Sequence, residues 1–134
     1  ESASVLEPKG EHGSTFGGNA LTCAAAYAST RYIIENDVSH NSNIMGQRLM
    51  EGLMDLERDC QPVTTVRGMG LLCAVEFSED VSAQVLSSCN ESGLLLNLVK
   101  PNAIRLMPPL TINESEVDEG LKRLKSGILK VFEG

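Results

Sequence analysis

The sequence predicts an α+β fold, a two-layer sandwich in which a small antiparallel or mixed sheet is covered by helices. Apolar residues recur at helical spacing in the first and last thirds of the chain, whereas the middle alternates apolar and polar residues at strand spacing. Gly and Pro separate these segments into short elements. Their order is helix, helix, strand, strand, helix, strand, strand, helix.

The first half of the chain is predicted to be mainly helical. An alanine-rich helix from about Ala20 to Glu35 follows residues 1–19, where Pro8 and several glycines interrupt any regular pattern. A second helix over 42–58 carries an apolar face made of Met45, Leu49, Leu53 and Leu56. We therefore assign residues 1–19 to the end of a preceding domain. Residues 20–134 would form a C-terminal domain together with the connecting helix.

The second half is predicted to build the sheet. Residues 63–66 and 69–77 are typical of two strands bent by the glycines near their junction. A short helix over 81–89 ends at Gly93. The apolar run 94–99 and a segment around Ile104 give two further strands, joined by a turn at 100–102.

The last helix has the clearest start and the clearest apolar face. Asn113 and Glu116 are spaced as a capping box, in which each side chain bonds the backbone of the other residue. Its apolar stripe consists of Val117, Leu121, Leu124, Ile128 and Phe132.

Composition excludes several classes of function. The net charge is −7 and the 11 basic residues form no cluster, which argues against a nucleic-acid partner. No apolar run reaches the roughly 18 residues of a membrane helix. The 4 cysteines have neither paired spacing nor a neighbouring histidine, so we expect buried free thiols, no metal and a cytoplasmic protein.

Residues 10–19, Gly-Glu-His-Gly-Ser-Thr-Phe-Gly-Gly-Asn, combine glycines and two hydroxyls with the start of a helix. Glycines let a ligand approach the backbone, and free N–H groups at a helix start favour anions. Ser14 and Thr15 are therefore candidate phosphate ligands. The alternative is an ordinary loop in which Asn19 caps the helix.

Three motifs in order resemble one enzyme family. Residues 12–19 with the alanine-rich helix, Arg-Gly-Met-Gly-Leu at 67–71 and Ile-Arg-Leu-Met-Pro-Pro-Leu at 104–110 are similar to class III, ornithine-type, pyridoxal-phosphate-dependent aminotransferases. Phe16 favours the acetylornithine branch. The resemblance implies the C-terminal small domain of a fold-type-I enzyme, packed beside a large domain in a homodimer.

The resemblance also implies roles for three residues. Thr15 would bind the phosphate of the cofactor, pyridoxal 5'-phosphate, held by the other subunit, and Ser14 would contact cofactor and substrate. Arg105 would hold the substrate carboxylate, since its planar fork matches two oxygens. The alternatives are local turn hydrogen bonds for the hydroxyls and a surface salt bridge from an edge strand for Arg105. The roles of His12 and Arg67 stay open.

The lysine that binds the cofactor covalently in this family has no counterpart in the sequence, so we name no catalytic residue and expect the chain alone to be inactive. The parent enzyme is expected to exchange an amino group between N-acetylornithine and 2-oxoglutarate in arginine biosynthesis. Ornithine, succinylornithine or 4-aminobutyrate are alternative substrates. A non-catalytic binding or dimerisation module is the alternative from another class.

Overall fold

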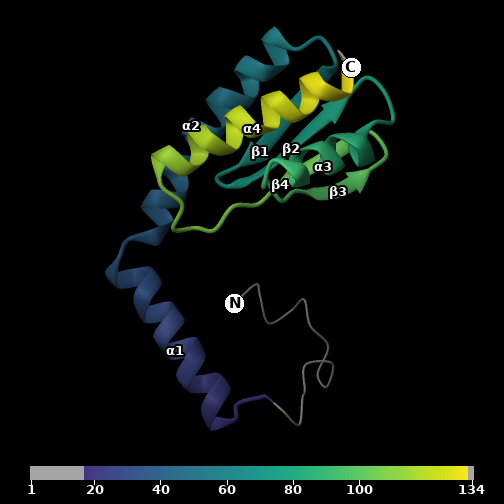
Figure 1. Cartoon of the computed structure of the whole chain (residues 1–134). Coiled ribbons are helices and arrows are strands. Elements are labelled where there is room, and N and C mark those ends of the chain that lie inside the picture. Colours follow the sequence, from purple (N-terminus) through teal and green to yellow (C-terminus); the bar gives the residue numbers. More distant parts are fainter. Residues whose placement is uncertain (1–16, 133–134) are drawn as a thin grey trace, which may run out of the picture. The chain divides into compact units, whose positions relative to one another are not determined.

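The computed structural model describes residues 17–132, which form four helices and four strands (Figure 1). The elements are α1 (Ala20–Glu35), α2 (Val38–Asp59), β1 (Val63–Met69), β2 (Leu72–Phe77), α3 (Ser82–Glu91), β3 (Asn97–Lys100), β4 (Ala103–Leu106) and α4 (Glu114–Phe132). The order of helices and strands confirms the prediction from the sequence.

The chain divides into two compact units, with the boundary between Asn36 and Asp37. In the first, Asn19 caps α1, and its side-chain oxygen accepts a hydrogen bond from the Thr22 N–H at 3.0 Å. No residue of α1 is buried.

The second unit begins at Asp37, which has an unusual backbone conformation. Asp37 has a φ of 46°, in the left-handed region that non-glycine residues rarely adopt. Helix α2 starts directly after it, at the buried Val38, and the prediction of a start at 42 was wrong. The polar residues between these positions gave no apolar signal for the first turn.

The four strands form one antiparallel sheet in the order β1-β2-β4-β3. Strand β4 is therefore internal, with β2 on one side and β3 on the other. Val75 lies opposite Val66 and Ile104, so these three side chains share one face of the sheet. Both Val75 and Ile104 are completely buried, which identifies this as the core face.

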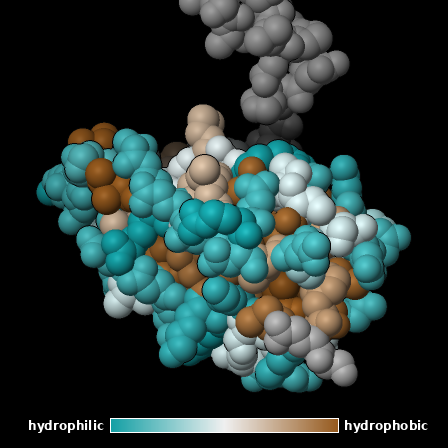
Figure 2. Space-filling model, turned by 90° about the horizontal axis from the view of Figure 1, so that it is seen from above, coloured by the Kyte–Doolittle hydropathy of each residue, from teal (hydrophilic) through white to brown (hydrophobic). Residues whose placement is uncertain are grey.

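Helices α2, α3 and α4 supply the other layer. Helix α4 packs against both α2 and α3, α2 contacts β1, and α3 contacts β3. The apolar core between the layers includes Leu53, Val85, Leu124, Phe77 and Ile128. Figure 2 shows that hydrophobic side chains reach the surface in separate patches among hydrophilic ones.

The ends of the elements show how local chemistry sets their bounds. The Glu116 N–H donates to Asn113 Oδ1 at 3.1 Å and the Asn113 N–H donates to Glu116 Oε2 at 3.0 Å, which confirms the capping box. Gly93, with φ of 78°, ends α3 as expected. The prediction of a strand from residue 94 was wrong, since β3 begins only at Asn97.

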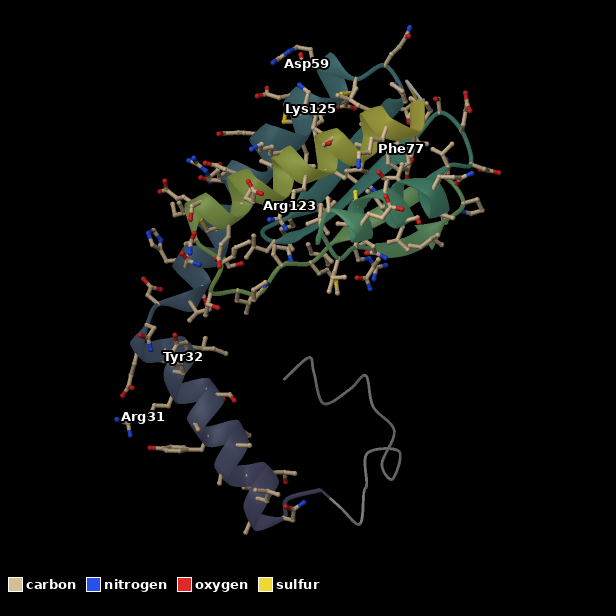
Figure 3. The ribbon with its side chains drawn as sticks, viewed as in Figure 1. Arg31, Tyr32, Asp59, Phe77, Arg123 and Lys125 are labelled. Carbon is tan, nitrogen blue, oxygen red and sulfur yellow. The ribbon has the colours of Figure 1, made fainter. Side chains whose placement is uncertain are left out.

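Polar contacts at the surface tie α4 to its neighbours. Lys125 lies beside Asp59 at the end of α2, with 3.7 Å between Nζ and Oδ2 (Figure 3). Arg123 donates to the Gly93 carbonyl at 3.2 Å and so connects α4 to the end of α3. These contacts join α4 to the ends of the two neighbouring helices.

Candidate functional site

The sheet has a second face, opposite the helices, that carries polar residues. Arg67 of β1 and Arg105 of β4 both lie opposite Ala74 of β2, and Asn97 of β3 lies opposite Arg105. Cross-strand partners share a face, so these four residues cross the sheet in one line, which we call the arginine row. Close by, the side chains of Met69 and Leu72 are 88% and 55% exposed.

Arg105 is placed in the arginine row by the alternation of strand β4. Its neighbours Ile104 and Leu106 are buried in the core, which directs Arg105 to the other face. Because β4 is internal, the alternative of an edge-strand arginine was wrong. Hydrogen bonds to strands on both sides fix the point from which the guanidinium leaves the sheet.

Arg105 is a half-buried residue, and its guanidinium has no ionic partner among residues 17–132. No carboxylate of that part of the chain lies within ion-pair distance of it, and no hydrogen bond engages its side chain. A guanidinium has five N–H donors in a planar fork and is always charged. The site can therefore accept a carboxylate from outside the described residues.

The neighbouring Arg67, in contrast, forms an ion pair. Its Nη1 donates to Glu76 Oε1, which joins β1 to β2 on the face of the arginine row. Arg67 thus lies within β1, whereas the sequence placed it between two predicted strands at 63–66 and 69–77. Glu76 and Asn97 were not predicted as site residues, and the only signal for Glu76 was a charged residue at an outward position of a strand.

The candidate phosphate ligands Ser14 and Thr15, together with His12, lie outside the described residues. Of the same motif the structure describes Gly17, Gly18 and Asn19. Asn19 is the N-cap of α1, as the sequence indicates.

The cysteines offer no second site in the described chain. Cys60, Cys73 and Cys89 are buried free thiols, as predicted, but Cys23 on α1 is exposed and that part of the prediction was wrong. Burial raises the pKa of the Cys73 and Cys89 thiols, which keeps them protonated and unreactive. Residues 17–132 contain no group of His, Cys, Asp or Glu side chains that could hold a metal ion.

An apolar pocket of about 330 Å³ lies where β4 ends. Leucines from α2, α4 and residues 94–96 line it, together with Met107, Pro108, Pro109 and Ile112. Glu116 and Asn97 are its polar lining residues. Within residues 17–132, no helix is long and apolar enough to cross a membrane.

Comparisons with known proteins relate this geometry to one family. The class III aminotransferase family (Aminotransferase class-III) matches residues 1–128. The acetylornithine aminotransferase of Bifidobacterium longum is 39% identical over 125 residues, which cover 93% of this chain and 28% of that protein. The ornithine aminotransferase of Plasmodium falciparum (isolate 3D7) is 38% identical over 118 residues, which cover 86% of this chain and 28% of that protein.

Solved structures of aminotransferases also resemble this chain. The crystal structure of acetylornithine aminotransferase from Elizabethkingia anophelis has a TM-score of 0.84 at 32% identity, covering 96% of this chain and 34% of that one. The ornithine aminotransferase of Toxoplasma gondii, which holds pyridoxal phosphate at partial occupancy in its active site, has a TM-score of 0.81 at 31% identity, covering 98% and 32%. The chain thus spans about a third of these relatives, and it belongs to the class III aminotransferase family.

Proposed function

We propose that this chain is the C-terminal portion of an acetylornithine aminotransferase, which exchanges an amino group between N-acetylornithine and 2-oxoglutarate in arginine biosynthesis. The observation that carries this proposal is Arg105, a half-buried residue on an internal strand whose guanidinium has no partner among residues 17–132. Relatives named acetylornithine aminotransferase, at 36 to 40% identity, support this substrate.

Arg105 is proposed to bind the α-carboxylate of the substrate. N-acetylornithine and 2-oxoglutarate both carry this group, so one guanidinium can orient both reactants in turn. Two parallel N–H···O bonds fix the plane of the carboxylate as well as its position. Such orientation lowers the barrier of the transfer because less freedom remains to be lost at the reacting centre.

The cofactor would be held mainly by parts of the enzyme beyond this chain. Pyridoxal phosphate, when bound, supplies the electron sink for amino transfer. Thr15 is proposed to bind the phosphate of the cofactor in the partner subunit, and Ser14 to contact cofactor and substrate. The remaining two-thirds of the family length would carry the large domain and the lysine that binds the cofactor covalently.

Further parts of the proposal follow from the same assignment. The protein would be a cytoplasmic homodimer, with residues 1–19 belonging to the large domain and residues 20–134 to the small domain. The 134-residue chain alone would be inactive. Ornithine is the second candidate substrate, because ornithine aminotransferase relatives are as similar, at 38 to 41% identity.

The first experiment is an absorbance titration of the 134-residue chain with pyridoxal phosphate, followed by borohydride reduction and peptide mapping. We expect no specific adduct. A single stoichiometric adduct at one lysine would contradict the proposal that the cofactor lysine lies elsewhere.

The second experiment uses the extended protein, which we define as this chain joined to the first two-thirds of the Bifidobacterium longum relative. It should bind pyridoxal phosphate and transfer the amino group of N-acetylornithine faster than that of ornithine. Faster transfer from ornithine would select the second candidate. An extended protein that folds but never binds the cofactor would favour the non-catalytic module.

The role of Arg105 is tested by Arg105→Lys in the extended protein. The fork is lost while the charge stays, so KM should rise and kcat/KM should fall by roughly ten-fold or more. Arg58→Lys is the matched control, because the Arg58 side chain is 72% exposed at the end of α2. Equal kinetics for Arg105→Lys and the control would exclude Arg105 from the substrate site.

A further inference from the structure

We propose that Arg67 is a positioning residue that keeps Arg105 available for substrate by holding the carboxylate of Glu76. The proposal rests on the proposed role of Arg105 as a carboxylate site. It assigns a function to an ion pair that would otherwise only join two strands.

The sheet register places Glu76 within reach of both arginines. Arg67 and Arg105 lie opposite Ala74 from the two sides, and Glu76 is two residues further along β2 on the same face. Glu76 is therefore the diagonal neighbour of each arginine, at a Cβ separation of about 7 to 8 Å or less, which long side chains can span.

Only one of the two arginines is bonded to Glu76. Nη1 of Arg67 donates to Glu76 Oε1, whereas the Arg105 guanidinium has no ion pair with any described residue. The other neighbours of Arg105 in the arginine row, Ala74 and Asn97, are uncharged and cannot neutralise it. Arg105 thus has no counter-ion among the described residues, and the carboxylate beside it is already paired with Arg67.

Glu76 is more shielded from solvent than its partner Arg67. Its side chain is only 26% exposed, while that of Arg67 is 54% exposed. A carboxylate at this depth is destabilised when it lacks a partner. If Arg67 were lost, Arg105 would be the nearest cation on this face, since Lys100 lies two strands away, about 10 Å across the sheet.

Pairing of Glu76 with Arg105 would compete with substrate. The apparent affinity for a carboxylate falls in proportion to the fraction of Arg105 that stays free. For a pair with the strength of an exposed ion pair, the apparent affinity falls about two- to six-fold. By occupying Glu76, Arg67 prevents this loss without itself touching the substrate.

The variants are chosen to separate this role from a purely structural one. Arg67→Met keeps the aliphatic stem and removes the charge, and Arg67→Lys keeps the charge. Glu76→Gln keeps the shape of the side chain and removes the competing carboxylate. If Arg67 acts only by joining β1 to β2, Arg67→Met and the double variant Arg67→Met/Glu76→Gln will be impaired alike.

The direct test is nitrogen-15 NMR of the arginine side chains in the 134-residue chain. Ion pairing hinders rotation of the guanidinium groups and so changes their line shapes. We expect hindered rotation for Arg67 and free rotation for Arg105 in the parent. In Arg67→Met, Arg105 should become hindered, and it should be free again in Arg67→Met/Glu76→Gln and in Arg67→Lys. An Arg105 signal that does not change in Arg67→Met would overturn the proposal.

Kinetics of the extended protein give the functional test. Arg67→Met should raise KM for 2-oxoglutarate about two- to six-fold with kcat unchanged, and the added Glu76→Gln should restore it. A KM increase that persists in the double variant would also overturn the proposal. If the proposed function fails, Arg105→Lys will leave KM unchanged, whereas the NMR result will still decide whether Arg67 keeps Arg105 free.

Discussion

Replacing Gly46 by alanine should destabilise the protein by about 2 kcal/mol, although alanine is the better helix former. Gly46 lies buried in α2, where the helix crosses the turn between β1 and β2. A Cβ atom at this position would lie 2.5 Å from the carbonyl carbon of Gly70 and 2.6 Å from its Cα and its oxygen. The backbone of Gly70 cannot rotate away as a side chain would.

The magnitude follows from two opposing effects. The added methyl group would be about 1 Å closer to the backbone than an ordinary contact of about 3.5 Å, so the helix and the turn must separate. Overpacking of a core costs about 1 to 3 kcal/mol, and this contact with backbone on a core helix belongs near the upper end. The gain in helix propensity offsets about 1 kcal/mol of it.

The assay is a thermal melt followed by far-ultraviolet circular dichroism. This signal is suitable because the chain has no Trp and its 2 Tyr, Tyr27 and Tyr32, both lie on α1, outside the unit under test. Gly46→Ala should lower Tm by roughly 8 to 16 °C.

Gly120→Ala is the matched control. This position lies in α4, and a Cβ there would have no atom within 4 Å. Helix propensity alone then acts, and Tm should rise by roughly 4 to 8 °C. A Gly46→Ala protein that melts at or above the parent temperature would refute the reasoning about close approach.

Three further outcomes are expected. Arg48 donates hydrogen bonds of 2.8 and 2.7 Å to Asp118, which hold the pKa of that carboxyl below its ordinary value of 3.8. The pair therefore stabilises the fold above that pH, and the difference in urea stability between the parent and Asp118→Asn should shrink as the pH falls below 3.8 and through the lowered pKa. Ser82→Ala should increase the free energy of unfolding by about 1 kcal/mol, because the buried Ser82 hydroxyl has no hydrogen-bond partner; a decrease would show that it has one. In the extended protein, Thr15→Ala should weaken cofactor binding by about 1 to 3 kcal/mol, and equal affinity would exclude Thr15 from the site.

Local patterns identified most of the secondary structure. The capping box at Asn113 and the apolar stripe of the last helix depend on residues three or four positions apart, and both are confirmed. Errors arose where the local signal was weak or ambiguous. The apolar run 94–96 has the composition of a strand, but Leu94 and Leu96 instead pack against the core from a segment without regular structure.

The candidate site was likewise predicted in part from the sequence, and in part it depends on contacts between distant residues. The motif around Arg105 predicted a residue that binds a carboxylate. It did so only through its resemblance to a family. Neither the spacing nor the composition could show that β4 is internal, because strand order depends on contacts between residues far apart in the chain. The pairing of Arg67 with Glu76 likewise depends on how β1 and β2 align.

The sequence by itself determined the family, the α+β class and the order of the elements, because these depend on short-range periodicity, caps and motifs. Only the tertiary structure decided which residues share a face of the sheet and which charges are satisfied. Cross-strand register brings Arg67, Ala74, Arg105 and Glu76 together from three strands, and it leaves Arg105 without an ionic partner among the described residues. The availability of a charge depends on its neighbours in space, and chain order alone does not specify them.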